Sequence, residues 1–140
     1  MDYAFNYYKL WYATSCIYVN NAVYFATNED PNIKLGYYKV PGAGTMSASI
    51  AKSSETTPIN TGKPNPISIN LVCERDNLDK SQCLMIGDSL YTDMQFANNA
   101  GIDGLLVLTG VTNQEEYEKY SKDPGMGVPT YYADDLRVFI

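Results

Sequence analysis

The sequence has 140 residues, 45% of them hydrophobic and 19% charged, with a formal net charge of −6; this is typical of a globular protein with one modest domain or two small parts of a larger one. The acidic balance argues against a nucleic-acid partner, and the lack of a run of about 18 apolar residues argues against a membrane partner. No histidine is present, which excludes histidine-based triads and imidazole metal sites and leaves carboxylates, lysine, hydroxyls and backbone N–H groups for any chemistry.

The first half of the chain predicts a helix, a short strand, a loop and a second helix. Apolar and aromatic residues at near-helical spacing favour a helix from Tyr7 to Tyr18, and "AVYFATN" is a short β-rich run that ends at Asn28. We expect a loop in "EDPNIKLGYYKVPGAG", because it contains two prolines and three glycines. "TMSASIAKSSE" follows as a short helix.

The second half alternates strands and helices. "TPIN" predicts a brief strand, "PISINLVCERDN" a helix whose first turn suits Pro66, "QCLMIGD" a buried strand, and "YTDMQFANNA" a helix that ends at Gly101. "GLLVLTG" is another apolar strand, "NQEEYEKYSK" a polar helix, "YYA" a short strand and "DDLRVFI" the start of a terminal helix. Strands that are apolar on both faces indicate an α/β fold whose parallel sheet is covered on both sides.

Two aspartates follow the buried strand in "LMIGDSLYTD". The turn at Gly87 directs Asp88 beyond the sheet edge, where parallel α/β sheets bind their ligands, and Asp93 lies in the first turn of the next helix. Two converging carboxylates without histidine suit a hard cation with oxygen ligands, and Mg²⁺ is the first candidate. The alternative is that both aspartates only cap the helix and complement its dipole.

A lysine on a rigid turn can return to the same edge of the sheet. Lys63 lies between Gly62 and Pro64 in "TGKPNP", and one helix and one strand separate it from Asp88. This path allows its ammonium group to meet an anion such as phosphate. The alternative is a solvated surface lysine, since most lysines are exposed.

In their order along the chain, these motifs resemble the haloacid dehalogenase superfamily. "GKPNP" is similar to its lysine motif, and "GDSLYTD" is similar to its Gly-Asp-x-x-x-x-Asp motif. Further blocks, "FNYYKLWYA", "FATNED", "PGAGTMSASI", "ANNAGI" and "LLVLTGVTNQEE", follow the pattern of the group of 4-nitrophenylphosphatases and phosphoglycolate phosphatases. The resemblance extends from about Tyr3 to Leu136.

The resemblance implies an α/β fold with a Rossmann-like parallel-sheet core and a large α/β cap inserted into it. Residues 1–55 are then expected to form the C-terminal half of the cap, and residues 56–140 the C-terminal half of the core. In the cap, Asn28 and Asp30 of "TNED" match a family loop near the substrate entrance.

The resemblance also implies a Mg²⁺-dependent phosphatase that hydrolyses the phosphomonoesters of small metabolites. A nucleophilic aspartate forms an aspartyl-phosphate that water then cleaves, and a second aspartate acts as acid and base. Lys63 is implied as the phosphate-binding lysine and Asp88 as a Mg²⁺ ligand. Asp93 is implied as a further acidic residue at or near the metal.

Two departures from the family pattern bear on this function. Many relatives carry arginine where this chain has Ser89, which leaves the role of that arginine open here. The Asp-x-Asp-Gly motif, which provides the nucleophile and the acid/base, is absent. Asp2 and Asp103 match the nucleophile by residue type alone, and Asp134 and Asp135 stand where a helix cap is expected.

Two hypotheses follow: a phosphatase fragment that is inactive by itself, or a catalytically inactive phosphate-binding or interaction module derived from that family. We expect a cytoplasmic protein with reduced cysteines, since no secretory leader is visible and the three cysteines lack metal-ligand spacing. A homo-oligomer is also expected, because without the family's first strand the uncharged strand Leu84–Ile86 becomes a sheet edge.

Overall fold

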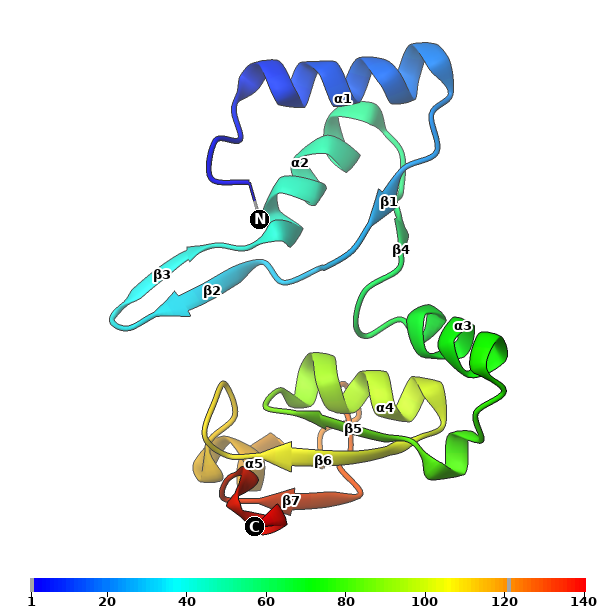
Figure 1. The fold of residues 1–140 in the computed structure, drawn as a ribbon. Coiled ribbons are helices and arrows are strands. Elements are labelled where there is room, and N and C mark those ends of the chain that lie inside the picture. The colour runs from blue at the N-terminus through cyan, green and yellow to red at the C-terminus, as the bar shows by residue number, and fades with distance from the viewer. Residues whose placement is uncertain (1, 121) are drawn as a thin grey trace. The chain divides into compact units, whose positions relative to one another are not determined.

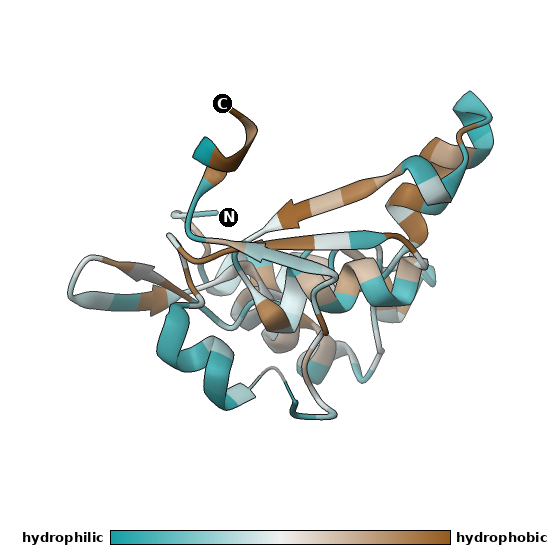
Figure 2. Ribbon diagram, turned by 90° about the horizontal axis from the view of Figure 1, so that it is seen from below, coloured by the Kyte–Doolittle hydropathy of each residue, from teal (hydrophilic) through white to brown (hydrophobic). Residues whose placement is uncertain are grey.

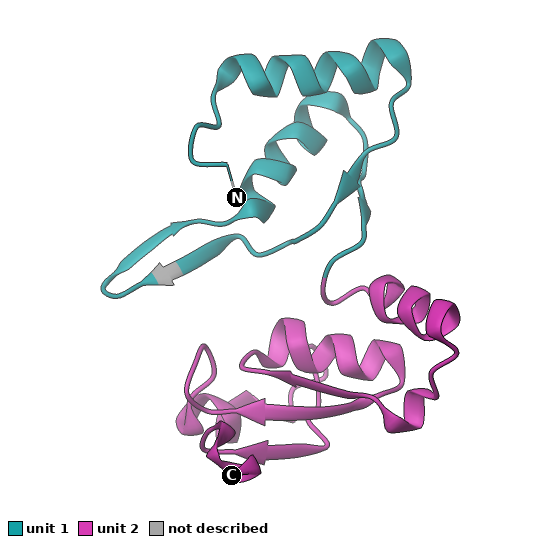
Figure 3. Cartoon of the chain, viewed as in Figure 1, with its two compact units in different colours: residues 1–62 teal, residues 63–140 magenta. Residues whose placement is uncertain are grey.

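The computed structural model describes residues 2–120 and 122–140, and the chain divides into two compact units, Met1–Gly62 and Lys63–Ile140 (Figure 3). Helices and strands alternate, and most strand pairs are parallel, which confirms the α/β fold class. None of the helices that the structure describes is long and apolar enough to cross a membrane.

In its described residues the first unit has two helices and two small sheets (Figure 1). Its elements are α1 (Tyr7–Asn20), β1 (Phe25–Ala26), β2 (Asn32–Leu35), β3 (Tyr38–Pro41), α2 (Ala43–Ser54) and β4 (Ile59–Asn60). β1 and β4 pair in parallel, and β2 and β3 pair in antiparallel. The expected domain boundary between residues 55 and 56 lies between α2 and β4, whereas the division between the two units follows Gly62.

The two helices predicted for this unit are confirmed, and their ends have local causes. The side chain of Asn6 accepts a hydrogen bond from the Lys9 N–H at 3.2 Å and so caps the first turn of α1. Asn21 ends α1 in the left-handed conformation that asparagine tolerates better than most residues. α1 packs against α2, and the hydroxyl groups of Thr14 and Ser53 lie 2.6 Å apart between them.

The prediction of a loop in residues 29–44 is wrong for the central part of this segment, because β2 and β3 form a hairpin there. Leu35 pairs with Tyr38, so Gly36 and Tyr37 make a two-residue turn, and Gly36 adopts a φ of 57°. Glycine meets this requirement without a steric cost. The prolines did not prevent pairing, since Pro41 lies at the end of its strand, where a missing N–H is tolerated.

The second unit is built on a three-stranded parallel sheet with the order β5-β6-β7 (Figure 1). Its elements are α3 (Ile67–Asp76), η1 (Lys80–Gln82), β5 (Leu84–Gly87), η2 (Leu90–Met94), α4 (Gln95–Ala100), β6 (Asp103–Val107), α5 (Gln114–Tyr120), β7 (Tyr131–Ala133) and η3 (Leu136–Phe139). η2 is a π-helical turn that continues into α4, and α4 packs against β5 and β6. Every strand and helix predicted for this unit is therefore present, apart from the last helix.

The predicted helix end at Gly101 is confirmed, since this glycine ends α4 with a φ of 69°. Pro66 precedes the first residue of α3, close to the predicted position in its first turn. The terminal α-helix is wrong: residues 136–139 form a 3₁₀ turn. There the Ile140 N–H donates to the carbonyl of Arg137 at 3.0 Å, which is the i→i+3 pattern.

The core of the second unit lies between β6 and the segment that follows β5. Leu90, Met94 and Leu106 form its buried centre. The expected covering of both sheet faces holds for β6 but not for β5, where Leu84 and Ile86 are each 42% exposed. Figure 2 shows the hydrophobic colour along β5 and over most of β6. The sheet thus has one partly open apolar face at the β5 edge.

Candidate functional site

Asp88 is the first residue after β5, at the carboxyl end of the parallel sheet. Its Oδ2 accepts a hydrogen bond from the Val111 N–H at 2.9 Å, and its backbone carbonyl accepts one from the Thr112 N–H at 2.9 Å. Both donors belong to the segment that follows β6. Two neighbouring strand ends therefore hold Asp88 in place, in the region where parallel α/β sheets bind ligands.

Asp93 is buried beneath this strand end, with 3% of its surface exposed. Its Oδ2 accepts hydrogen bonds from the N–H groups of Asp88 at 3.0 Å and Ser89 at 3.2 Å. Its Oδ1 accepts from Nζ of Lys63 at 2.5 Å. Because a buried carboxylate is costly unless its charge is paired and hydrogen-bonded, these three donors explain why Asp93 is tolerated here.

Lys63 lies just before α3 and reaches Asp93 by its side chain, which is 44% exposed. An ammonium group carries three N–H donors. Asp93 receives one of them, and within residues 2–120 and 122–140 no second hydrogen bond from Nζ is found. The ion pair therefore fixes the position of the ammonium and leaves two donors for an anion.

Two glycines allow the carboxylates to approach the backbone. A Cβ on Gly87 would lie 2.3 Å from Cγ of Asp93, and a Cβ on Gly110 would lie 1.8 Å from Oδ2 of Asp88. No side chain fits at either distance, so the site needs glycine on both sides. Gly87 was expected to let the chain turn, and its second purpose is to leave space for Asp93.

Two hydroxyl residues support this strand end: Ser89, whose role the sequence left open, and Thr112, which sequence reasoning missed. The Ser89 hydroxyl accepts from the Thr92 N–H at 3.2 Å and caps η2, which gives a structural role to the residue at the family's arginine position. Thr112 is buried, and its Oγ1 accepts from the Leu90 N–H at 3.3 Å. The only signal for Thr112 was its place in the block "LLVLTGVTNQEE".

The predicted magnesium ligands differ in what they offer a cation. Oδ1 of Asp88 has no hydrogen bond within the described parts of the chain, so this half-buried carboxylate suits a hard cation. Both oxygens of Asp93 are already occupied by the donors named above. No group of three or more Cys, Asp or Glu side chains that could hold a metal occurs among the described residues. Of the two predicted ligands, only Asp88 thus has a carboxylate oxygen available to a cation among the described residues.

The predicted cap residues Asn28 and Asp30 form a pair in the first unit. Nδ2 of Asn28 donates to Oδ2 of Asp30 at 2.7 Å, and the Asp30 N–H donates to Oδ1 of Asn28 at 2.7 Å. A Cβ on Gly42 would lie 2.2 Å from the Asp30 carbonyl oxygen, and a Cβ on Gly44 would lie 2.3 Å from that of Glu29. The "GAG" segment is thus required to hold the "TNED" loop close.

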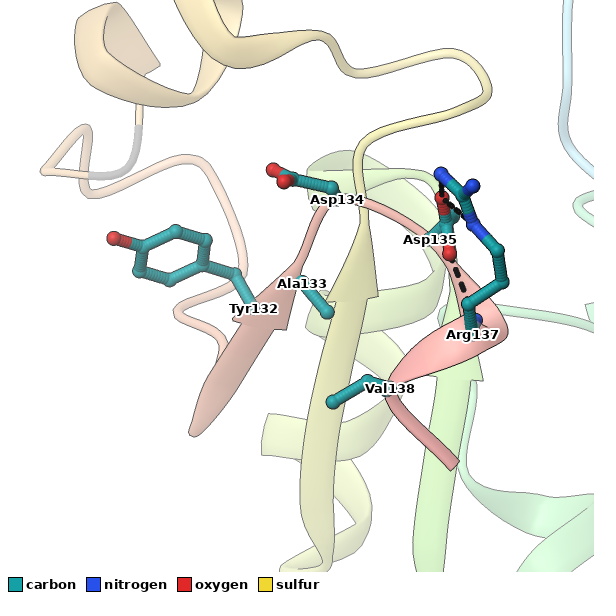
Figure 4. A pocket seen from close by; sticks show the side chains of 6 residues that line it. All are labelled: Tyr132, Ala133, Asp134, Asp135, Arg137 and Val138. Carbon is teal, nitrogen blue, oxygen red and sulfur yellow. Dashed lines mark hydrogen bonds and ion pairs between the residues drawn. The ribbon is translucent and has the colours of Figure 1, made fainter. Parts of the chain in front are cut away.

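A cleft of about 490 Å³ near the end of the chain contains two of the other aspartates (Figure 4). Asp135 caps η3 by accepting from the Arg137 N–H at 2.7 Å, as expected for a helix start, and it pairs with the Arg137 guanidinium. The guanidinium and this N–H hold the pKa of the Asp135 carboxyl below its usual value. Asp2 is likewise occupied, since it pairs with Lys9 at 2.6 Å, and Asp103 is exposed at the start of β6.

A family model described as HAD-hydrolase-like matches residues 60–138, which is more than half of the chain. Phosphoglycolate phosphatase 2 of Arabidopsis thaliana is 40% identical over 139 residues, which cover 97% of this chain and 45% of that protein. The chain therefore spans about half the length of the curated relatives it matches.

Solved structures agree with this similarity. A 4-nitrophenylphosphatase from Thermotoga maritima superposes with a TM-score of 0.80 at 34% identity, over 96% of this chain and 50% of that one. A glycerol phosphate phosphatase from Mycobacterium tuberculosis in complex with magnesium superposes with a TM-score of 0.82 at 32% identity, over 98% of this chain and 40% of that one.

Proposed function

The chain belongs to the HAD-hydrolase-like family, and from this premise we propose that it forms the phosphate- and metal-binding part of a Mg²⁺-dependent phosphomonoester hydrolase of small phosphorylated metabolites. The predicted resemblance to the haloacid dehalogenase superfamily, and within it to the 4-nitrophenylphosphatases and phosphoglycolate phosphatases, is confirmed. The names of these relatives support phosphate esters as the substrate class.

One observation supports this function above the others: Asp88 and the Lys63–Asp93 pair meet at the carboxyl end of a parallel sheet. The buried carboxylate of Asp93 accepts hydrogen bonds both from the ammonium of Lys63 and from the backbone N–H of Asp88. A phosphoryl group with its metal needs both a positive donor for its oxygens and a hard oxygen ligand for the ion. Lys63 offers the positive donor and Asp88 the oxygen ligand, and Asp93 contacts both residues.

The proposed roles follow from these contacts. Lys63 donates to the phosphoryl oxygens, and Asp88 binds the metal through the oxygen that Val111 does not occupy. When bound, Mg²⁺ neutralises charge on the phosphoryl group. We further propose that Asp93, predicted as a metal ligand, acts by positioning Lys63 and the N–H groups of the strand end.

We assign the first part of the chain, residues 1–55, to the cap and residues 56–140 to the core, as the family resemblance implies. Asn28 and Asp30 are then cap residues near the substrate entrance. Their mutual hydrogen bonds support a loop of fixed shape. A loop that faces the substrate needs such a shape to hold its polar groups in place.

Mg²⁺ binding tests the role of Asp88. We expect titration with MgCl₂ to shift the amide NMR signals of residues 87–93 most strongly, with weak affinity because water supplies most of the ligands. Asp88→Asn should abolish these shifts, since it removes the charge and keeps the shape. Asp103→Asn is the matched control, because it makes the same change at an exposed residue of the neighbouring strand, and the shifts should persist. Shifts centred elsewhere, or retained in Asp88→Asn, would exclude this assignment.

Turnover is a separate question from binding. We expect the 140-residue chain to hydrolyse 4-nitrophenyl phosphate no faster than Asp88→Asn, because the family's nucleophile motif is not in this sequence and catalytic groups of this kind act as a unit. The measurement is nitrophenolate release at saturating Mg²⁺. Hydrolysis clearly above that of the variant would mean that another residue provides the nucleophile.

A further inference from the structure

Two of the three cysteines lie side by side in the second unit, away from the carboxylate site. Sγ of Cys73 and Sγ of Cys83 are 3.9 Å apart. Cys73 is in the last turn of α3, and Cys83 directly precedes β5. The third cysteine, Cys16, belongs to α1 of the first unit. We propose that Cys73 and Cys83 are a redox modification site, at which a small-molecule disulfide oxidant converts the two thiols into an intramolecular disulfide.

The backbone holds both cysteines where they face each other. The carbonyl of Cys73 accepts hydrogen bonds from the N–H groups of the helix cap Asn77 and of Leu78, the latter at 2.9 Å. The N–H of Cys83 donates to the carbonyl of Lys80 at 3.0 Å and closes η1. Both ends of the short connection are therefore fixed. The two sulfur atoms must close from 3.9 Å to the bonding distance of about 2.05 Å.

The two thiols differ in exposure, which assigns them different parts in the reaction. Cys73 is buried, with 7% of its surface exposed, whereas Cys83 is half-buried. Burial raises the pKa of the Cys73 thiol, and its hydrogen bond with Cys83 raises it further. A reagent in solution therefore meets Cys83 first, and Cys73 is the resolving thiol behind it.

The reaction is ordinary thiol–disulfide exchange with an oxidant of the type RSSR. The Cys83 thiolate attacks one sulfur of RSSR, forms a mixed disulfide and releases RS⁻. Cys73, after losing its proton to solvent, attacks Sγ of Cys83 and releases the second RS⁻. Two protein thiols are oxidised, RSSR is reduced to two RSH, and both protons are accounted for. The new bond joins the end of α3 to the start of β5, whose other end carries Asp88.

This inference does not depend on the proposed phosphatase function, and a thiol count tests it. The fully reduced chain is treated with oxidised glutathione, blocked with iodoacetamide and analysed by mass spectrometry. We expect the number of alkylated cysteines to fall from three to one, with Cys16 as the one that still reacts. Dithiothreitol should restore all three.

Digestion with trypsin locates the bond. Cleavage after Arg75 and Lys80 separates the peptide that contains Cys73 from the peptide that contains Cys83, so without reductant the two should be recovered as one linked species. Cys16→Ser is the matched control and should give the same linked species. Cys83→Ser should keep both remaining thiols reactive, and Cys73→Ser should stop at a glutathione adduct on Cys83.

Three results would overturn the proposal: all three cysteines alkylated after oxidation, a stable glutathione adduct on Cys83 in the unsubstituted chain, or linkage between two chains. Since Cys73→Ser changes a buried residue, the adduct on Cys83 is also sought in Cys73→Ala. The thiol count and the tryptic digest of the unsubstituted chain decide the proposal even if neither variant folds.

Discussion

Replacing Asp93 by alanine is expected to lower the free energy of unfolding of the second unit by about 3 kcal/mol, since unpaired buried donors and broken buried ion pairs each carry costs of this order. The carboxylate is buried and is the acceptor for the N–H groups of Asp88 and Ser89. Its loss removes an acceptor from both groups. It also removes the partner of Lys63, which contributes less because that ammonium is partly solvated.

The measurement is urea unfolding followed residue by residue from amide NMR signals. Signals from β5 and η2 report on the altered site, and the same signals in the unsubstituted chain provide the reference. Asp103→Ala is the matched control variant, because it removes an exposed carboxylate from the same sheet and should cost less than about 1 kcal/mol. Equal urea midpoints for Asp93→Ala and Asp103→Ala would contradict the role of Asp93 in holding Lys63 and the N–H groups of the strand end.

A second variant separates the two functions of this carboxylate. Lys63→Met keeps the acceptor for both N–H groups but removes the ammonium group. We expect it to weaken phosphate binding, measured by ³¹P line broadening of inorganic phosphate, with a smaller loss of stability than Asp93→Ala. A stability loss as large as that of Asp93→Ala would instead make the ion pair the dominant contribution.

Self-association through the β5 edge is the second large effect that we expect. In the described residues β5 pairs only with β6, and its residues Leu84, Met85 and Ile86 carry no charge that would oppose pairing with another chain. Leu84 and Ile86 are also partly exposed on the open face. Burying about 300 Å² of apolar surface contributes roughly 7 kcal/mol before the cost of association. Strand pairing adds backbone hydrogen bonds.

Light scattering over a concentration series measures this effect. We expect the mean mass to rise above 15.6 kDa at concentrations of tens of micromolar. Ile86→Lys should return the chain to the monomer by placing a charge at the edge, whereas Tyr37→Lys adds the same charge to the exposed turn of the β2–β3 hairpin and should have no effect. A single species of 15.6 kDa at every concentration, with concentration-independent unfolding, would contradict the expected homo-oligomer.

Much of the second unit could be predicted from the sequence because its signals are local. Apolar runs in "LMIGD" and "LLVLTG" indicated strands, of which only the second is buried, and Gly101 indicated a helix end. The position of Asp88 followed from the strand end, and the strand-helix alternation predicted a parallel sheet. These features depend on residues that are near one another in the chain.

Features that depend on contacts between distant residues were decided only by the tertiary structure. Lys63 was expected at the same sheet edge as Asp88, but its partner is Asp93, which is thirty residues away and also receives the strand-end N–H groups. The 3.9 Å approach of Cys73 to Cys83 gave no sequence signal, because no spacing rule identifies it. How far the face of β5 is open was also decided by the tertiary structure, since "LMI" has the same composition whether a sheet face is covered or not. Hydrophobicity and local propensity predict which elements form, whereas burial and pairing depend on which elements meet after the chain has folded.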